Sequence, residues 1–457
     1  MTTTAKITPS IAKTTRDILG VGYLSDSWAK TGTNVEDFFK ILKALDAVTT
    51  FDKTFIKDIV FCSPYNHEED SITFKCFATP KACGKRLSQN KFTAACLDVL
   101  YAELVKQRGC LLWEGGLGGE KLCREKALRE LMNTLGLSGS AIEKQSPRRD
   151  AYIAELIAQT PDKRQVTLVS RTEGDDTAAF TKVMAVRSDK YRPVPLTELE
   201  TVFNAILDSD MGEVVCKRWY VDHDFAEIDI EFPAATKEFK ELCGLDENIE
   251  AGVRLVTSGT GYSCVCAKET WRVNSTVSEH NIVKNKHIGK WSTEDFVERV
   301  KENIFDEYAK LPERLCELFD VVILDSDDVE INGGVPYAEK VLTDCAKEVF
   351  KYINLASAFK IKADDDKERR RNHVNRITEL LVQSFSVEMQ KAIANGEKHI
   401  ITAYDFALAV MTLPERVKGI PQSYMETFAN LCGKAAYAPY SSEVKSAEAA
   451  SEISFVA

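Results

Sequence analysis

Residues 165–187 read QVTLVSRTEGDDTAAFTKVMAVR, and this stretch decides the fold class. Gln165 to Arg171 and Phe180 to Arg187 are rich in β-branched and apolar residues, which favour strands. Between them, Gly174-Asp175-Asp176 supplies residues that suit a tight turn. The sequence therefore predicts a β-hairpin over this stretch.

The residues after the hairpin continue the pattern. Pro193 and Pro195 end the second strand, and a helix is expected from Leu196 to about Ile206. Short strands are then expected in two groups, within 214–232 and within 253–273. Short strands joined by short turns indicate antiparallel pairing, so we expect a mostly antiparallel sheet with helices packed against it.

The regions on either side of this sheet have apolar residues at helical spacing. Asn34 can cap a helix whose apolar face includes Phe38 and Leu42, while Ser71 to Phe77 alternates like a strand. Further helices are expected at 92–104, 120–135, 293–324, 335–359, 368–393, 402–413 and 421–434.

These elements predict an α+β fold class, with a central, mostly antiparallel sheet domain between an α-rich N-terminal region and a helical C-terminal region. The expected parts are a loose lead-in at 1–20, an α-rich N-terminal domain with a short sheet at 21–150, an α+β core domain at 151–291, a helical C-terminal domain at 292–440 and a disordered tail at 441–457.

The composition is that of an ordinary globular protein. The chain has 457 residues, of which 44% are hydrophobic and 28% are charged. No apolar run approaches the ~20 residues that span a bilayer, and Met1 to Lys6 lacks the apolar core of a signal peptide. We therefore expect a cytoplasmic protein without membrane association. The 13 cysteines form no Cys-x-x-Cys pair, which is typical of free thiols, so neither a metal nor a cofactor is expected.

Four motifs resemble those of a known family, in the same order along the chain. The first is Arg171-Thr172 followed by Val183 to Pro193 and Glu198-Leu199; the others are Gly252 to Gly261, Lys286-His287-Ile288-Gly289, and Thr402 to Val410. The chain resembles, over roughly residues 125 to 430, the phage- and plasmid-like proteins that carry domain of unknown function 932. At Trp271 to Ser275 it departs from that family's cysteine-containing motif. The resemblance implies a phage, prophage or plasmid setting and transfers no biochemical activity.

A basic segment with interleaved aromatic residues is the first candidate site. Basic side chains can hold phosphates while aromatic rings stack on bases, as single-stranded nucleic acid requires. The alternative is a solvated loop with two core tryptophans. The candidate residues are Lys268, Trp271, Arg272, Lys284, Lys286, His287, Lys290 and Trp291, with Lys85 and Arg86 as an extension of the same groove.

Two acidic clusters are rich enough in carboxylates to be considered as metal sites, but only the first has a suitable spacing. Asp222, Asp224 and Glu227 could hold a divalent metal in a nuclease site, because carboxylates at alternate strand positions share one face. The same alternation describes a strand whose acidic face is turned to solvent. The cluster from Asp325 to Glu330 fails the calcium-loop pattern and is expected to be a loop.

The leading hypothesis is a non-enzymatic nucleic-acid-binding protein that favours single-stranded DNA and acts in recombination, annealing or replication. The net charge of −11 then has to be offset by a basic groove on one face, which a homo-oligomer can repeat. Two alternatives remain open: an interaction or assembly factor that binds a host or phage protein, and a metal-dependent nuclease.

Overall fold

The computed structural model describes residues 15, 17–20, 22–68, 71–76, 84–88, 111–114, 120–137, 148–173, 180–208, 212–243, 249–273, 276–288, 291–309, 318–352, 367–416 and 432. The helix expected at 92–104, nearly all of the helix expected at 421–434, the tail at 441–457 and most of the lead-in lie outside these ranges. No helix in these ranges has the length and apolar content needed to cross a membrane.

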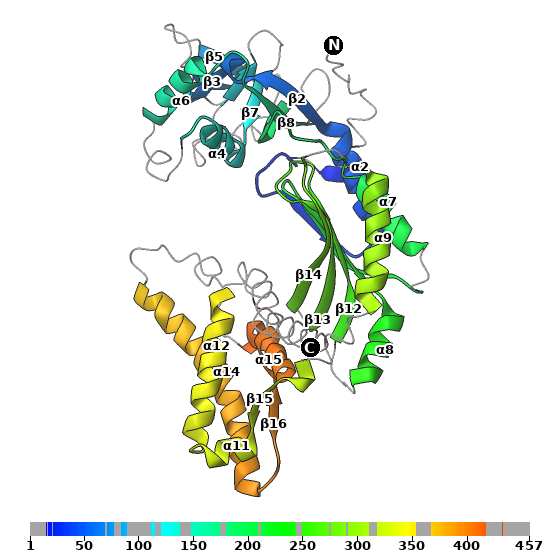
Figure 1. The fold of residues 1–457 in the computed structure, drawn as a ribbon. Coiled ribbons are helices and arrows are strands. Elements are labelled where there is room, and N and C mark those ends of the chain that lie inside the picture. The colour runs from blue at the N-terminus through cyan, green and yellow to red at the C-terminus, as the bar shows by residue number, and fades with distance from the viewer. Residues whose placement is uncertain are drawn as a thin grey trace, which may run out of the picture.

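An eight-stranded sheet forms the first lobe, shown at the top of Figure 1, with the strand order β2-β8-β9-β7-β6-β3-β4-β5. Its neighbours pair antiparallel except β7 and β9, which are parallel. Helices α4 (Glu125–Thr134) and α6 (Arg148–Gln159) share a buried apolar core with it. The strands are β2 (Thr49–Phe55), β3 (Ile59–Glu68), β4 (Ser71–Cys76), β5 (Gly84–Ser88), β6 (Leu111–Glu114), β7 (Glu120–Cys123), β8 (Gln165–Glu173) and β9 (Phe180–Ser188), with a 3-10 turn, η1 (Ile56–Asp58), after β2.

A six-stranded sheet forms the centre of the molecule and is antiparallel throughout, in the order β1-β10-β11-β12-β13-β14. Helices α7 (Glu198–Leu207), α8 (Pro233–Cys243) and α9 (Thr293–Ala309) lie along one side of it (Figure 1), and α2 (Val35–Val48) also packs on it. The strands are β1 (Ala29–Gly32), β10 (Val215–Asp222), β11 (Ala226–Glu231), β12 (Ile249–Thr257), β13 (Val265–Val273) and β14 (Thr276–Asn285).

The C-terminal part combines helices with a two-stranded ribbon of β15 (Val322–Asp325) and β16 (Ile400–Thr402). Its apolar residues belong to the same buried core as the six-stranded sheet, as Leu342, Leu381 and Phe406 illustrate. The sheet and these helices therefore share one continuous core. The helices are α11 (Ser326–Ile331), α12 (Val335–Tyr352), α14 (Lys367–Asn395) and α15 (Ala403–Arg416).

The α+β class and the antiparallel central sheet are confirmed. The predicted hairpin is β8 and β9, which pair with Leu168 opposite Val186. The predicted cap is also present, because the Asn34 side chain accepts a hydrogen bond of 3.1 Å from the backbone N–H of Asp37. Local alternation and capping residues were sufficient to locate these elements.

The expected boundary at residue 150 does not separate two sheets. Strand β2 pairs with β8, and β1 pairs with β10, so the N-terminal region contributes strands to both large sheets. The sheet in the N-terminal region is therefore larger than expected, because β2 to β7 all belong to the eight-stranded sheet. Strands such as β7, with the sequence EKLC, are too short to show an alternating pattern of their own.

Three local expectations also differ from the structure. The helix expected from residue 120 is strand β7 up to Cys123, and α4 begins at Glu125. The end of the helix expected to continue to Leu324 is strand β15. The acidic cluster expected to be a loop is helix α11, whose N-cap Asp325 accepts a 3.0 Å hydrogen bond from Asp327 N. Acidic residues favour this position because the N-terminal end of a helix carries a partial positive charge.

Candidate functional site

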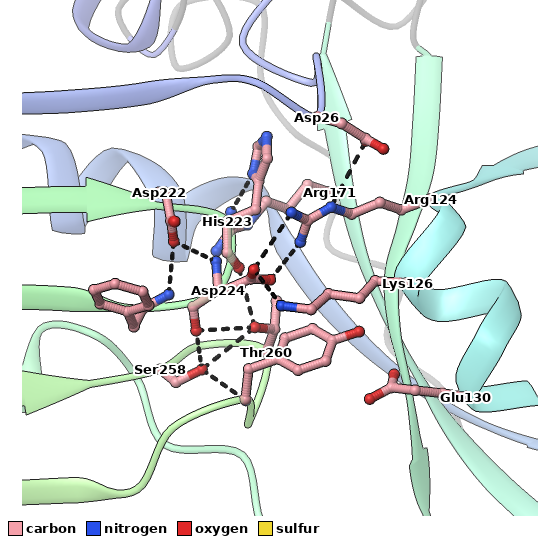
Figure 2. A network of polar contacts seen from close by, with 12 residues as sticks. Asp26, Arg124, Lys126, Glu130, Arg171, Asp222, His223, Asp224, Ser258 and Thr260 are labelled. Carbon is pink, nitrogen blue, oxygen red and sulfur yellow. Dashed lines mark hydrogen bonds and ion pairs between the residues drawn. The ribbon is translucent and has the colours of Figure 1, made fainter. Parts of the chain in front are cut away.

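Loops at one end of the six-stranded sheet contact the eight-stranded sheet through buried polar groups (Figure 2). The β10–β11 turn, residues 223–225, reaches Arg171 on β8 and Arg124 before α4. The β12–β13 loop, residues 258–264, reaches Arg187 on β9, whose Nε donates a 2.7 Å hydrogen bond to Thr260 O. Residues far apart in the sequence thus meet at this junction.

Asp224 is the centre of the charge network at the junction. One carboxylate oxygen accepts a hydrogen bond from Arg124, and the other lies 2.6 Å from Lys126 Nζ (Figure 2). Burial acts to raise the pKa of Asp224, but the hydrogen bonds from Arg124 and Lys126 outweigh it and hold the pKa below its usual value. The ionised carboxylate therefore ties the start of α4 to the β10–β11 turn.

His223 is a neutral, structural histidine. It is 1% exposed and lies beside Arg171, which is also 1% exposed. Arg171 Nη1 is 2.8 Å from His223 Nδ1, and a guanidinium can only donate, so Nδ1 accepts and Nε2 donates to Ser25 O at 2.9 Å. Burial, together with the charge of Arg171, holds the pKa of His223 well below its usual value. Burial lowers the pKa of Arg171 to about 10, so the guanidinium remains charged at neutral pH.

Short polar side chains hold the backbone of the same turn. Asp222 Oδ1 accepts hydrogen bonds from Asp224 N at 2.7 Å and from Phe225 N at 2.9 Å. Thr260 Oγ1 donates to His223 O at 3.0 Å, and Ser258 Oγ donates to Asp224 O. The turn is thereby fixed from within and from the β12–β13 loop.

An open cleft of about 440 Å³ lies next to this network. Its walls come from α4, the end of β9, the β12–β13 loop and the residues that follow β14. The lining residues that matter for its chemistry are Glu130, Asn133, Arg187, Tyr191, Tyr262 and Lys286.

The charges inside the cleft are largely compensated. Arg187 Nη1 lies 2.6 Å from Glu130 Oε1. The Arg187 guanidinium and the Lys126 ammonium each lie 4.1 Å from the centre of the Tyr262 ring. Lys286, in contrast, is exposed and has no ion pair within the described ranges. The uncompensated positive charge is therefore at the rim of the cleft.

Gly261 lets the β12–β13 loop approach Tyr191 closely. Its φ is +73°, and a Cβ there would lie 2.5 Å from Tyr191 Cε2. Gly136 has a similar φ of +82° but nothing within 4 Å of its Cβ position. We expect Gly261→Ala to lower the free energy of unfolding by about 1–3 kcal/mol more than Gly136→Ala, because only the former adds a steric clash to the backbone cost. Urea unfolding of the two variants measures this difference. An equal decrease in the free energy of unfolding for both variants would contradict the close contact between Gly261 and Tyr191.

The face of the six-stranded sheet opposite its apolar core carries a dense ion-pair network. A cross-strand row places Arg218, Asp229, Arg254 and Lys268 side by side on β10 to β13. Asp229 is 4% exposed and lies 2.8 Å from both Arg254 Nη2 and Arg272 Nη2. Asp229 is the one acidic member of this row, and its ion pairs with Arg254, Arg218 and Arg272 compensate much of the positive charge on this face.

The predicted basic residues fall into two groups. Lys268, Arg272 and Lys284 share the polar face, because Lys284 lies opposite Cys266, two residues before Lys268 on β13. Arg272 is already engaged by Asp229 at 2.8 Å and by Glu250 at 3.7 Å. Lys284 and Lys286 are exposed at the end of edge strand β14, and no ion pair in the described part of the chain involves them. Among the members of the set whose side chains the structure describes, these two lysines are the exposed ones.

The aromatic members of the prediction are used for packing where the structure describes them. His287 is 5% exposed and stacks on Tyr191, with ring centres 5.5 Å apart. Burial lowers the pKa of His287, so it adds no positive charge at neutral pH. Trp291 Nε1 donates a 2.9 Å hydrogen bond to Lys286 O, and the Arg192 guanidinium lies 4.7 Å from its ring centre. The alternative of a solvated loop does not hold for Thr276–Asn285, which form strand β14.

The remaining predicted residues lie beyond what the structure describes. Trp271 is on β13, and Lys85 and Arg86 are on β5, but their side chains are outside the described part. Lys290 is outside it altogether.

The proposed metal ligands do not converge. Asp222 holds the turn, Asp224 is bound by Arg124 and Lys126, and Glu227 Oε1 accepts a 2.9 Å hydrogen bond from Arg218. Over the described ranges, no group of three or more His, Cys, Asp or Glu residues could hold a metal ion. The expected solvent-facing acidic strand is also wrong, because Asp229 on that face is buried among arginines.

Sequence reasoning missed several residues that build the cleft, notably Lys126, Glu130, Asn133 and Tyr262. A usable signal existed for others. Three of the four family-like motifs contribute lining residues: Val183 to Pro193 through Arg187 and Tyr191, Gly252 to Gly261 through Gly261, and Lys286 to Gly289 through Lys286 and His287.

Comparison with known proteins gives no relative for this fold or site. No family model matches the chain. No curated protein matches it, and no solved structure does.

Proposed function

We propose that the protein binds single-stranded nucleic acid and is not an enzyme. The observation that carries this proposal is the pair of exposed lysines, Lys284 and Lys286, which leads along the edge strand β14 to the rim of the cleft. Lys268 lies on the same face one strand further in. Phosphates are attracted to the uncompensated charges of Lys284 and Lys286, and their binding releases counterions from the strand.

The arrangement favours a single strand over a duplex. The positive charge follows one short path and ends at a cleft lined by the aromatic side chains of Tyr191 and Tyr262. A single strand can follow such a path while its unstacked bases make separate contacts. The expected stacking role of Trp291 is weakened, because Arg192 lies over its ring.

The biological setting belongs to the proposal as well. The four motifs that resemble domain of unknown function 932 favour a phage, prophage or plasmid process such as recombination, annealing or replication. A homo-oligomer that repeats the basic rim is part of the proposal, because the rim of one copy offers two lysines, Lys284 and Lys286, without an ion pair in the described part of the chain. The net charge of −11 opposes association of the copies, so contacts between them have to outweigh it.

One observation favours the alternative role of an interaction or assembly factor. The β15–β16 ribbon exposes apolar side chains, with Val322 53% and Ile400 38% exposed, and Ile331 at the end of α11 is 80% exposed. Exposed apolar groups of this kind are typical of protein contacts. Binding to a protein partner that withstands high salt would support this role over the nucleic-acid role.

Charge reversal at the two lysines tests the leading proposal. We expect Lys284→Glu with Lys286→Glu to weaken binding of a labelled 30-nucleotide single strand by about tenfold or more. The slope of log affinity against log salt should become shallower by about 0.7 for each phosphate that the variant no longer neutralises. Fluorescence anisotropy across a salt series measures both quantities.

Lys340→Glu with Lys391→Glu is the matched control. These lysines are exposed on α12 and α14, and the double substitution changes the net charge by the same amount. The control should bind nearly as the natural chain does. An equal loss in both double variants would mean that total charge, and not the β14 edge, governs binding, and would contradict the proposed interface.

A further inference from the structure

The cleft at the end of β14 has the size and shape of a small-ligand site. Its volume of about 440 Å³ lies within the range of roughly 300–1,000 Å³ found for such sites. It is also rigidly built, because the Arg187–Glu130 ion pair and the Gly261–Tyr191 contact fix two of its walls. The cleft is therefore already formed before a ligand binds.

The chemistry of the cleft differs between its interior and its rim. In the interior, the acid Glu130 is paired with Arg187, and His287 is held neutral by burial. Tyr191 and His287 stack on each other and are 6% and 5% exposed, so they close the inner end of the cleft without offering a free ring face. At the rim, Lys286 carries a positive charge. The cleft thus suits a molecule with a neutral planar body and an anionic group at one end.

Polar groups that can recognise a planar heterocycle also line the cleft. Asn133 is exposed near the end of α4, and its amide can both donate and accept hydrogen bonds. Ser188 and Ser263 add hydroxyl groups that can do the same. Hydrogen bonds from amide and hydroxyl groups to the base edges are one means by which proteins bind an unstacked nucleobase.

We infer that the cleft binds one unstacked nucleobase of the bound strand, while the adjoining phosphate lies on Lys286. This inference rests on the proposed function, because the ligand is a nucleotide of the same strand that follows β14. It adds a base-binding subsite, lined by Asn133 and Tyr191, to an interface otherwise made of phosphate contacts.

The test compares a strand that has bases with one that lacks them. The natural chain should bind a thymine strand of 15 nucleotides about tenfold more tightly than an abasic strand with the same number of phosphates. Asn133→Trp places a large ring in the cleft without removing a described hydrogen bond of the Asn133 side chain. It should reduce the preference for the thymine strand over the abasic strand toward unity. Titration with deoxyadenosine monophosphate, with inorganic phosphate as a parallel arm, shows whether the cleft also takes a free nucleotide.

Asn204→Trp is the matched control, because Asn204 is an exposed helical asparagine on α7 and does not line the cleft. It should keep the full preference for bases. Equal affinity of the natural chain for both strands would overturn the cleft inference and leave the phosphate-binding proposal standing. Binding of the free nucleotide without binding of either strand would overturn the proposed function and assign the cleft to a mononucleotide. Loss of the preference in Asn204→Trp as well would overturn the assignment to the cleft.

Discussion

Replacing Asp229 with alanine should lower the free energy of unfolding by about 3–5 kcal/mol. The carboxylate is 4% exposed and interacts with three arginines, at 2.8 Å from Arg254 Nη2, 2.8 Å from Arg272 Nη2 and 3.6 Å from Arg218 Nε. Burial acts to raise the pKa of Asp229, but its hydrogen bonds and ion pairs with these arginines outweigh burial and lower the pKa. Without the carboxylate, like charges face one another in a region with little water.

Urea unfolding measures this loss, and Asp344→Ala provides the control. Asp344 forms an exposed ion pair with Lys347 at 2.8 Å, and losing it should lower the free energy of unfolding far less than losing Asp229, because water screens exposed pairs. The double variant Asp229→Ala with Arg254→Met should be more stable than Asp229→Ala alone, because it also removes the charge of Arg254, which is 2% exposed. If Asp229→Ala lowers the free energy of unfolding no more than Asp344→Ala does, the description of a buried ion-pair network around Asp229 is contradicted.

Asp224→Asn should destabilise the protein by about 3 kcal/mol, because it leaves Arg124 and Lys126 beside a neutral side chain. The side chain of Arg124 is 10% exposed, so water can replace little of the lost interaction. The substitution also distinguishes structure from catalysis. A nuclease carboxylate would affect metal-dependent cleavage, whereas the geometry predicts a loss of stability.

Acid should reduce the effect of Asp224→Asn. The pKa of Asp224 in the folded protein lies below its usual value, which is about 3.9 in the unfolded chain. Its contribution to stability is therefore complete above that pH and is lost as the pH falls through the folded-state pKa. The difference in unfolding free energy between natural chain and variant should be constant near pH 7 and shrink below about pH 4.

Glu125→Gln is the control for this substitution. It neutralises an exposed carboxylate on α4, the helix that Asp224 contacts through Lys126. Glu125 lies 3.2 Å from Arg129, and its loss should cost at most about 1 kcal/mol of unfolding free energy. If Asp224→Asn lowers the free energy of unfolding no more than Glu125→Gln does, the junction between the sheets does not depend on the Asp224 carboxylate.

The sequence predicted elements whose pattern is local. The hairpin β8–β9 followed from two apolar runs around a Gly-Asp turn, and the start of α2 followed from Asn34. Strand β14 was missed because its sequence, TVSEHNIVKN, is largely polar and does not alternate cleanly. Pairing with β13, which no local pattern encodes, makes it a strand.

The candidate site was only partly predictable for the same reason. Lys284 and Lys286 were found because they belong to one basic segment. Arg124 and Asp224 are 100 residues apart, and Arg171 and His223 are 52 residues apart, so their contacts depend on the tertiary fold. Arg272 was expected to bind phosphate, but its carboxylate partner Asp229 lies on a different strand. The sequence shows where the basic residues are, whereas the fold determines which of them form ion pairs with carboxylates.

Fluorescence anisotropy of the natural chain with labelled single- and double-stranded oligonucleotides, across a salt series, tests whether the β14 edge and the adjoining cleft bind single-stranded nucleic acid. The mass of the protein and of the complex is measured alongside. We expect tighter binding of the single strand and an affinity that falls linearly in log salt. No binding of either oligonucleotide at low salt would contradict this expectation and leave the protein-partner role as the remaining candidate.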